Sequence, residues 1–178
     1  MDADQRRDQL KQARAGDGRA FDELLAPVLD PAFRLAMTML NDRTAAEDAV
    51  QEAALKTWRK LAKFRPDAEM RPWFLAVVAN ECRTARRGRW WRVIRSGDAN
   101  RLSPGTSSDR GWADHVDLDV ALDRLAPNHL LALSLYYHLD LPIEEVARVL
   151  GCSVGGARQR IHRALVAVRP GMAIEVNG

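Results

Sequence analysis

Apolar residues recur every three or four positions along most of this 178-residue chain. That spacing is typical of helices that bury one face, and no run of alternating β-branched residues indicates a strand. The pattern therefore predicts an all-α protein. In the first part of the chain, helices are expected over residues 21–28 and 33–40, with Pro31 interrupting the helical pattern between them.

A long helix is expected to begin at Thr44. Glu47 follows three residues later, as in a capping box, where two side chains satisfy backbone N–H groups at the start of a helix. The residues whose spacing turns them inward are Val50, Ala54, Trp58 and Leu61. Those turned outward are Asp48, Gln51, Glu52 and Arg59. Pro72 suits the first turn of a further helix that runs to about Arg87.

Two short helices joined by a tight turn are predicted in the segment LPIEEVARVLGCSVGGARQRIHRALVAV, residues 141–168. Gly151 can adopt the left-handed conformation that ends the first helix, and Ser153 can cap the second. The residues expected to face inward are Ile143, Val146, Ala147, Leu150, Val154, Ala157, Ile161, Leu165 and Val168. Gln159, His162 and Arg163 point outward, flanked by Arg158 and Arg160. This arrangement is typical of a helix-turn-helix that enters a DNA major groove, and the alternative is an ordinary helical hairpin with a solvated basic face.

The helical pattern dissolves between these two parts of the chain. The stretch RSGDANRLSPGTSSDRGW is rich in Ser, Gly, Asp and Arg, which predicts a flexible linker. Helices are expected again over residues 116–125 and 127–137. The chain is therefore divided into two small helical domains, residues 1–87 and 115–170, with a linker over 88–114 and a short tail over 171–178.

The net charge of +3 is unevenly distributed. Residues 71–101 carry 8 basic and 2 acidic side chains, and Trp90 and Trp91 lie among them. A basic block beside aromatic residues favours a nucleic-acid surface, and the alternative is a basic linker that merely stays solvated. The two tryptophans could stack on single-stranded bases, cover the domain surface or contact a partner. Trp58 and Trp73 are expected to pack within the first domain.

Little in the chain points to catalysis or to a metal. Cys82 and Cys152 are the only cysteines, and neither has a metal-binding spacing. The histidines are scattered, without paired carboxylates or a glycine-rich phosphate loop. We therefore expect no cofactor, no metal and no catalytic residue. The chain opens without an apolar signal segment, and residues 73–79, its longest apolar run, are too short to span a bilayer, so a cytoplasmic protein is expected.

Three segments in this order resemble the bacterial extracytoplasmic-function (ECF) sigma factors, of the sigma-70 type. DRTAAEDAVQEAALKTWRKLAKF, residues 42–64, is similar to the helix of that family that binds core RNA polymerase. RPWFLAVVANECRTARR, residues 71–87, is similar to the helix that engages the −10 promoter element. EEVARVLGCSVGGARQRIHRAL, residues 144–165, is similar to the helix-turn-helix that recognises the −35 element. Gly156 and Ala157 depart from this pattern, since the family usually has Thr and Val there.

The resemblance implies promoter-specific transcription initiation with core RNA polymerase, and it implies site residues. Those implied for polymerase binding are Asp48, Gln51 and Glu52. Those implied for the single-stranded −10 non-template strand are Phe64, Arg65, Asp67, Met70, Arg71, Asn80, Arg83, Arg86 and Arg87. Those implied for the duplex −35 element are Arg158, Gln159, Arg160, His162 and Arg163. An anti-sigma factor is a further expected partner, by family alone.

Three other functions are compatible with parts of the pattern. A two-domain regulator that binds duplex DNA by itself shares the helix-turn-helix, but it gives no role to residues 42–64 or 71–87. A small enzyme lacks a supporting constellation of catalytic side chains. A helical adaptor that binds only protein does not explain the arginines of the last helix. The prediction is therefore a transcription initiation factor rather than an enzyme.

Overall fold

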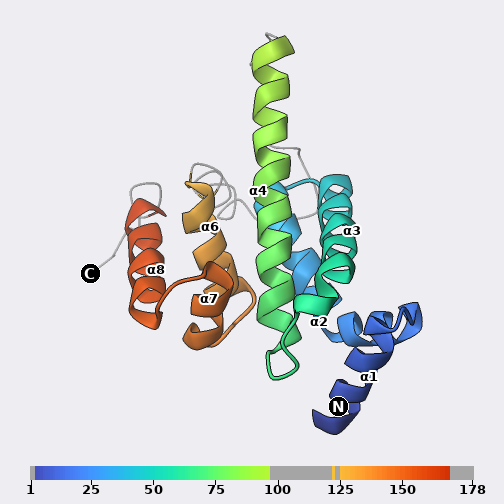
Figure 1. The fold of residues 1–178 in the computed structure, drawn as a ribbon. Helices are drawn as coiled ribbons and strands as arrows, with labels where there is room; N and C mark the ends of the chain where they lie inside the picture. The colour runs from blue at the N-terminus through green and yellow to red at the C-terminus, as the bar shows by residue number, and fades with distance from the viewer. Residues whose placement is uncertain (1–2, 97–121, 123–124, 169–178) are drawn as a thin grey trace. The chain divides into compact units, whose positions relative to one another are not determined.

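The computed structural model describes residues 3–96, 122 and 125–168, and throughout this part the regular structure is helical, without a strand (Figure 1). The predicted all-α fold is confirmed. The chain is divided into two compact units, Met1–Ala85 and Arg86–Gly178. The predicted tail, and most of the predicted linker and of the helix expected over 116–125, lie outside the described residues, as do the side chains of Trp90 and Trp91.

The first unit is built from α1 (Ala3–Arg14), α2 (Gly18–Leu40), α3 (Arg43–Lys60), the single 3₁₀ turn η1 (Leu61–Lys63) and the first part of α4 (Met70–Ser96). Helix α2 lies between α1 and α3 and contacts both. Helix α4 starts two residues before the expected Pro72 and continues past Arg87. The expectation that the helical pattern ends at residue 88 is therefore wrong, because the backbone stays helical to Ser96.

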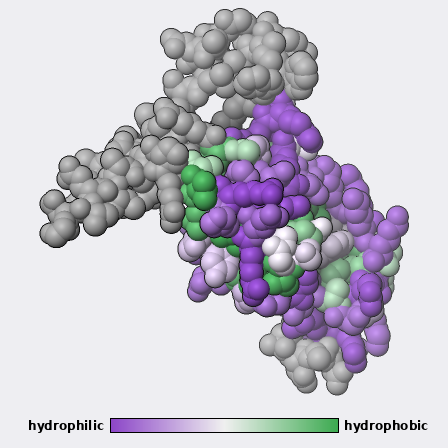
Figure 2. Space-filling view, turned by 90° about the vertical axis from the view of Figure 1, so that its left-hand side faces the viewer, coloured by the Kyte–Doolittle hydropathy of each residue, from purple (hydrophilic) through white to green (hydrophobic). Residues whose placement is uncertain are grey.

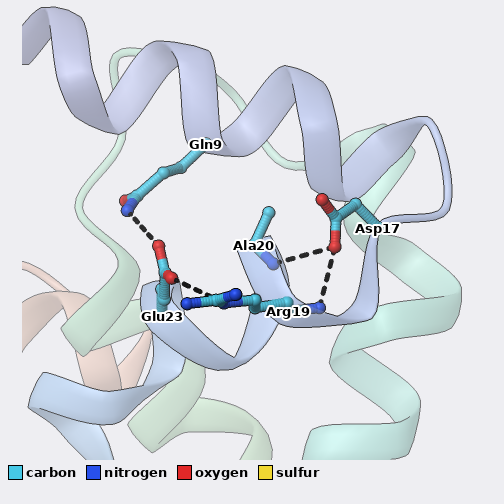
Figure 3. A network of polar contacts seen from close by, with 5 residues as sticks. All are labelled: Gln9, Asp17, Arg19, Ala20 and Glu23. Atoms are coloured by element: carbon cyan, nitrogen blue, oxygen red, sulfur yellow. Dashed lines mark hydrogen bonds and ion pairs between the residues drawn. The ribbon is translucent and has the colours of Figure 1, made fainter.

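Helix α2 begins at a side-chain cap and continues through two prolines. The Asp17 carboxylate accepts the backbone N–H groups of Arg19 and Ala20, which have no partner within the helix (Figure 3). The predicted interruption at Pro31 is wrong, because the helix runs unbroken past Pro27 and Pro31. Both prolines lie outside the continuous buried face of α2, whose packing offsets the loss of two backbone hydrogen bonds.

Helix α3 is capped by a different residue from the one the sequence suggested. The Asp42 carboxylate accepts the N–H of Ala45 at 3.0 Å, so the helix begins at Arg43 and Thr44 lies inside it. Glu47 pairs with Arg43 at 2.9 Å instead of completing a capping box. Both Asp42 and Thr44 are good capping residues, and the first one in the chain takes the position.

The buried face of α3 is also rotated from the predicted one. It consists of the small residues Ala46, Ala49, Ala53 and Thr57. Among the residues expected inward, Leu61 is buried, whereas Val50, Ala54 and Trp58 are half-buried at the edges of that face. Trp58 packs edge-on against Phe21 of α2, with ring centroids 5.0 Å apart, which confirms its role within the first unit.

The second unit contains α6 (Pro127–Leu133), a π-helical turn η3 (Ser134–His138), α7 (Ile143–Leu150) and α8 (Val154–Val168). Both α6 and α7 contact α8. The residues that form this small core include Leu131, Leu135, Val146, Ala157 and Ala164, each fully buried. Helix α6 is shorter than expected, because Leu139 donates its N–H to Ser134 across a wider turn, at 2.9 Å.

Most of the coloured surface in Figure 2 is hydrophilic, with smaller hydrophobic areas between the polar side chains. The large hydrophobic residues exposed in the described part of the chain are Leu29, Leu55, Tyr136, Tyr137 and Val166. None of the described helices combines the length and the apolar character needed to cross a membrane.

The orientation of α3 can be tested with a pair of substitutions. Ala53 is 0% exposed, so Ala53→Leu is expected to lower the free energy of unfolding by about 1–3 kcal/mol through overpacking. Leu55, two residues further on, is 47% exposed, and Leu55→Ala should change it by less than about 0.5 kcal/mol. Urea denaturation followed by circular dichroism measures both. Comparable losses from the two variants would contradict this orientation.

Candidate nucleic-acid and polymerase interfaces

The turn between α7 and α8 has the geometry predicted from its sequence. Gly151 ends α7 in the left-handed conformation, with φ 62°, and donates its N–H to the carbonyl groups of Ala147 and Arg148. Ser153 precedes α8, and its hydroxyl oxygen accepts the N–H of Gly156 at 3.1 Å. The helix-turn-helix is therefore confirmed, with both helix ends satisfied by the predicted residues.

One side of α8 is buried and the other carries polar side chains. Ala157, Ile161 and Ala164 are buried, so the exposed residues Arg158, Gln159, His162 and Arg163 lie on the opposite side. We call these four residues the α8 outer face. It combines positive charge with hydrogen-bond donors and acceptors, the groups that read base edges and hold phosphates.

Arg160 lies apart from the α8 outer face. It is half-buried, and its Nη1 donates to the carbonyl oxygen of Leu150 at 3.3 Å. That carbonyl belongs to the last turn of α7, where backbone oxygens lack helical partners and a cation is favourable. Arg160 therefore links α8 to α7. The sequence alone could not distinguish this contact within the protein from a contact with DNA.

The two glycines of α8 have different surroundings. A Cβ atom added to Gly155 would meet nothing within 4 Å, whereas one added to Gly156 would lie 3.3 Å from the Ser153 hydroxyl oxygen. A side chain at 156 would therefore press on the serine that caps the helix. The departure from the usual Thr at this position leaves room for the Ser153 cap.

The polar residues predicted for α3 do lie on its outside. Asp48 and Gln51 are exposed and Glu52 is half-exposed, and Leu55 follows on the same side at helical spacing. We call these four residues the α3 outer face. Leu55 was not among the predicted site residues, although its position seven residues after Asp48 places it there. An exposed leucine among polar residues is the composition of many protein-binding surfaces.

An ion pair connects α3 to α4. Lys56 Nζ lies 2.6 Å from Glu81 Oε2 on α4 and 3.4 Å from Glu52 Oε1 on α3. The hydrogen bond to Glu81 is the main reason that the pKa of Lys56 is raised above its ordinary value, and burial opposes it. Lys56 therefore stays charged and links α3 to α4.

Asn80, next to Glu81, is exposed on α4. Its side-chain oxygen accepts a hydrogen bond from Arg83 Nη1 at 2.6 Å, and its backbone carbonyl accepts one from the Thr84 hydroxyl at 3.0 Å. Arg87 is exposed and Arg86 half-exposed on the next turn. The structure therefore brings together an amide and three arginines on one part of α4, a set suited to a nucleic-acid strand.

The predicted loop over residues 64–71, here called the 64–71 loop, ends at Glu69 in the structure, because Met70 and Arg71 form the start of α4. It is held by buried side chains at Phe64 and Met70. Phe64 is 6% exposed and packs on Trp73, with ring centroids 4.7 Å apart, and Met70 is 7% exposed. Both side chains lie in the core of the free protein, and the contact with DNA predicted for Phe64 and Met70 stays a prediction. Trp73 has the packing role that was expected of it.

The middle of the 64–71 loop carries the exposed polar side chains. Arg65 and Asp67 are exposed there, and Arg65 Nη2 donates to Asp67 Oδ2 at 2.8 Å, whereas Arg71 is exposed on the first turn of α4. This hydrogen bond is the main cause that lowers the pKa of the Asp67 carboxyl below its ordinary value. The Asp67 carboxyl therefore remains ionised at neutral pH, and it is exposed where a ligand could reach it.

The family described as Sigma-70 region 2 matches residues 24–92, and the family described as Sigma-70, region 4 matches residues 115–168. The ECF RNA polymerase sigma factor SigC of Mycobacterium tuberculosis is 30% identical over 156 residues, covering 85% of this chain and 83% of its own length. The chain belongs to the ECF sigma factors of the sigma-70 family.

Solved sigma factors share this fold. The sigma factor RpoE of Bartonella quintana, in complex with the anti-sigma factor NepR, aligns with a TM-score of 0.70 at 23% identity, covering 87% of this chain and 98% of that one. CnrH, in complex with the cytosolic domain of CnrY, aligns with a TM-score of 0.67 at 25% identity, covering 95% and 96%. Another relative, the RNA polymerase sigma factor RfaY of Xanthomonas campestris, is 29% identical, and this chain spans 42% of its length.

Membership of this family establishes promoter-specific transcription initiation with core RNA polymerase as the function of the ECF sigma factor. Each of the described surfaces lies within one of the two matched regions. Region 2 contains the α3 outer face, Asn80 and the 64–71 loop, and region 4 contains the helix-turn-helix.

The different surroundings of Arg163 and Arg160 predict different effects of truncation. Arg163→Ala should cost about 1–3 kcal/mol of binding to a matched −35 element if the guanidinium binds a base edge. Arg160→Ala should instead lower the free energy of unfolding by about 1 kcal/mol, because it removes a contact between α7 and α8. Holoenzyme binding to matched and scrambled −35 sequences, with thermal unfolding of each variant, separates the effects. If Arg163→Ala loses the same binding free energy on matched and scrambled sequences, Arg163 contacts only phosphates.

Proposed function

We propose that the ECF sigma factor docks on core RNA polymerase through the α3 outer face. The strongest support is that Asp48, Gln51 and Leu55 are exposed on one side of a helix whose other side is fully packed. Leu55 supplies apolar area at the C-terminal end of this face, and Asp48 with Glu52 supplies negative charge. Such a face suits a basic partner helix with an apolar residue to meet the leucine.

The second part of the proposal concerns the −10 element. The 64–71 loop receives a base of the non-template strand, with Arg65, Asp67 and Arg71 as the polar groups that meet it. Asn80 contacts the same strand, and Arg83, Arg86 and Arg87 hold its phosphates. The support is that these side chains, unlike Phe64 and Met70, are exposed or half-exposed along the loop and the adjoining α4.

The third part assigns the −35 element to the α8 outer face. Arg158, Gln159, His162 and Arg163 enter the major groove, while Arg160 maintains the position of α8 on α7. The two DNA-binding surfaces belong to separate units, each too small to bind tightly alone. Tight and specific binding therefore requires the polymerase to present both units to one promoter.

An anti-sigma factor is a further proposed partner, supported by the solved relatives that are in complex with such factors. It would inhibit the sigma factor by covering the surfaces that bind polymerase or DNA. We also propose that the chain acts as an initiation factor without catalysis of its own. Its place of action is then the cytoplasm, where the bacterial polymerase works.

Two variants are expected to distinguish docking of the sigma factor on polymerase from melting of the promoter DNA. Asp48→Arg should weaken association with core polymerase before any DNA is present, because it puts positive charge against a basic partner. Asn80→Ala should leave that association unchanged and reduce open-complex formation. Fluorescence anisotropy of labelled sigma factor measures assembly, and permanganate reactivity of promoter thymines measures opening. Asp22→Arg, a reversal of an exposed acid on α2, is the matched control for assembly.

A pre-melted promoter sharpens this test. It should partly restore transcription by Asn80→Ala, because the strands are already separated, and it should not restore transcription by Asp48→Arg. The assignment of α3 fails if Asp48→Arg assembles as well as the Asp22→Arg control. The assignment of Asn80 fails if its truncation weakens assembly as much as the Asp48 reversal does.

A further inference from the structure

Helix α1 lies before the region 2 match, which begins at residue 24, yet it is packed onto the first unit. Leu10 and Ala13 are buried, and α1 contacts both α2 and η1. Gln9 Nε2 donates to Glu23 Oε2 of α2 at 2.8 Å (Figure 3). The helix is therefore an integral part of the unit, although none of the three DNA-binding or polymerase-binding surfaces includes it.

The last residue of α1 reaches the start of the 64–71 loop. Arg14 Nε donates to the carbonyl oxygen of Leu61 at 3.2 Å, and Arg14 Nη2 donates to the carbonyl oxygen of Phe64. These carbonyls lie where the helical stretch formed by α3 and η1 ends, and the Leu61 carbonyl also accepts the Phe64 N–H at 3.1 Å. A guanidinium there binds two of them at once and carries the charge that a helix C-terminus favours.

A second arginine of α1 lies near the same loop. The pKa of Asp67 is lowered first by its hydrogen bond with Arg65, and in smaller part by the positive charge of Arg7. Arg7 precedes Arg14 by seven residues, which places the two on one side of α1. One side of α1 therefore directs positive charge at both the start and the middle of the 64–71 loop.

We propose that Arg14 is a positioning residue for the 64–71 loop, and that α1 sets which base the loop accepts at the −10 element. This inference rests on the proposed role of the loop. Arg14 itself does not contact DNA. By holding the carbonyls of Leu61 and Phe64, it fixes the backbone from which Arg65 and Asp67 extend, so its loss changes base preference as well as stability.

Hydrogen exchange in the free full-length protein tests the contact without DNA. The Ala68 N–H, which donates to the Arg65 carbonyl within the loop at 3.0 Å, is the reporter. Arg14→Ala should raise its exchange rate by about tenfold, the effect of losing one net hydrogen bond of restraint. Gln9→Ala, which removes a different polar contact of α1, is the matched control and should leave the rate unchanged. Arg14→Lys should restore it in part, since an ammonium keeps the charge but lacks the planar fork.

Base preference tests the consequence. Holoenzymes are compared for binding to single-stranded −10 oligonucleotides that differ only at the base the loop would hold. Arg14→Ala should reduce the ratio between preferred and disfavoured bases by about fivefold, a loss in the range of one polar contact, with core binding unchanged. Gln9→Ala should keep the wild-type ratio.

The exchange rates and the base ratios together test the role of Arg14. If the Ala68 exchange rate is the same in Arg14→Ala and in the wild type, Arg14 does not hold the loop and the inference is wrong. If exchange rises while the base ratio stays the same, Arg14 restrains the loop without setting its base preference, and the inference is wrong. If the wild type itself binds every base at this position equally well, the proposed role of the loop fails instead. If Gln9→Ala changes both readouts as much as Arg14→Ala, general docking of α1 replaces the specific role of Arg14.

Discussion

The small inner face of α3 is the constraint on which the first unit depends. Ala46, Ala49, Ala53 and Thr57 let the helix approach its neighbours closely, and close packing at small residues leaves α3 a single rotation about its axis. That rotation places Leu55, the one leucine of α3, in solvent beside Asp48 and Gln51. On α4, burial of Phe74, Val78 and Cys82 leaves Asn80 on the outside, and the ion pair from Lys56 to Glu81 links the two helices.

In the second unit, too, the packing of small residues determines which side chains face outward. The side of α8 that carries Ala157 and Ala164 packs inward, and this determines that Arg158 and Arg163 face outward. The turn adds an angular constraint, because Gly151 ends α7 in a conformation that most residues adopt only at a cost. Arg160 then joins the two helices. Packing by small residues thus decides both polar faces, and the exposed side chains of those two faces add little to the stability of either unit.

Helical periodicity was enough to predict the all-α fold, the turn at Gly151, the Ser153 cap and the outward residues of α8, because all of these depend on neighbours in sequence. It gave the wrong inner face of α3, since a pattern of hydrophobicity favours Val50 and Trp58 over alanines, whereas close packing favours the alanines. Burial of Phe64 depends on Trp73, and the contacts of Arg14 cross 47 and 50 residues of chain. No local pattern contains such contacts.

The 64–71 loop combines fixed ends with an exposed middle. Phe64 and Met70 are buried at its two ends, Arg14 binds the carbonyl of Phe64, and Arg65 and Asp67 pair with each other in between. A loop held in this way loses little conformational entropy when a ligand binds, so more of the contact energy is kept as affinity. The residues between the anchors can vary without loss of the loop's position. Recognition and attachment are therefore carried by different residues, and α1 belongs to the attachment.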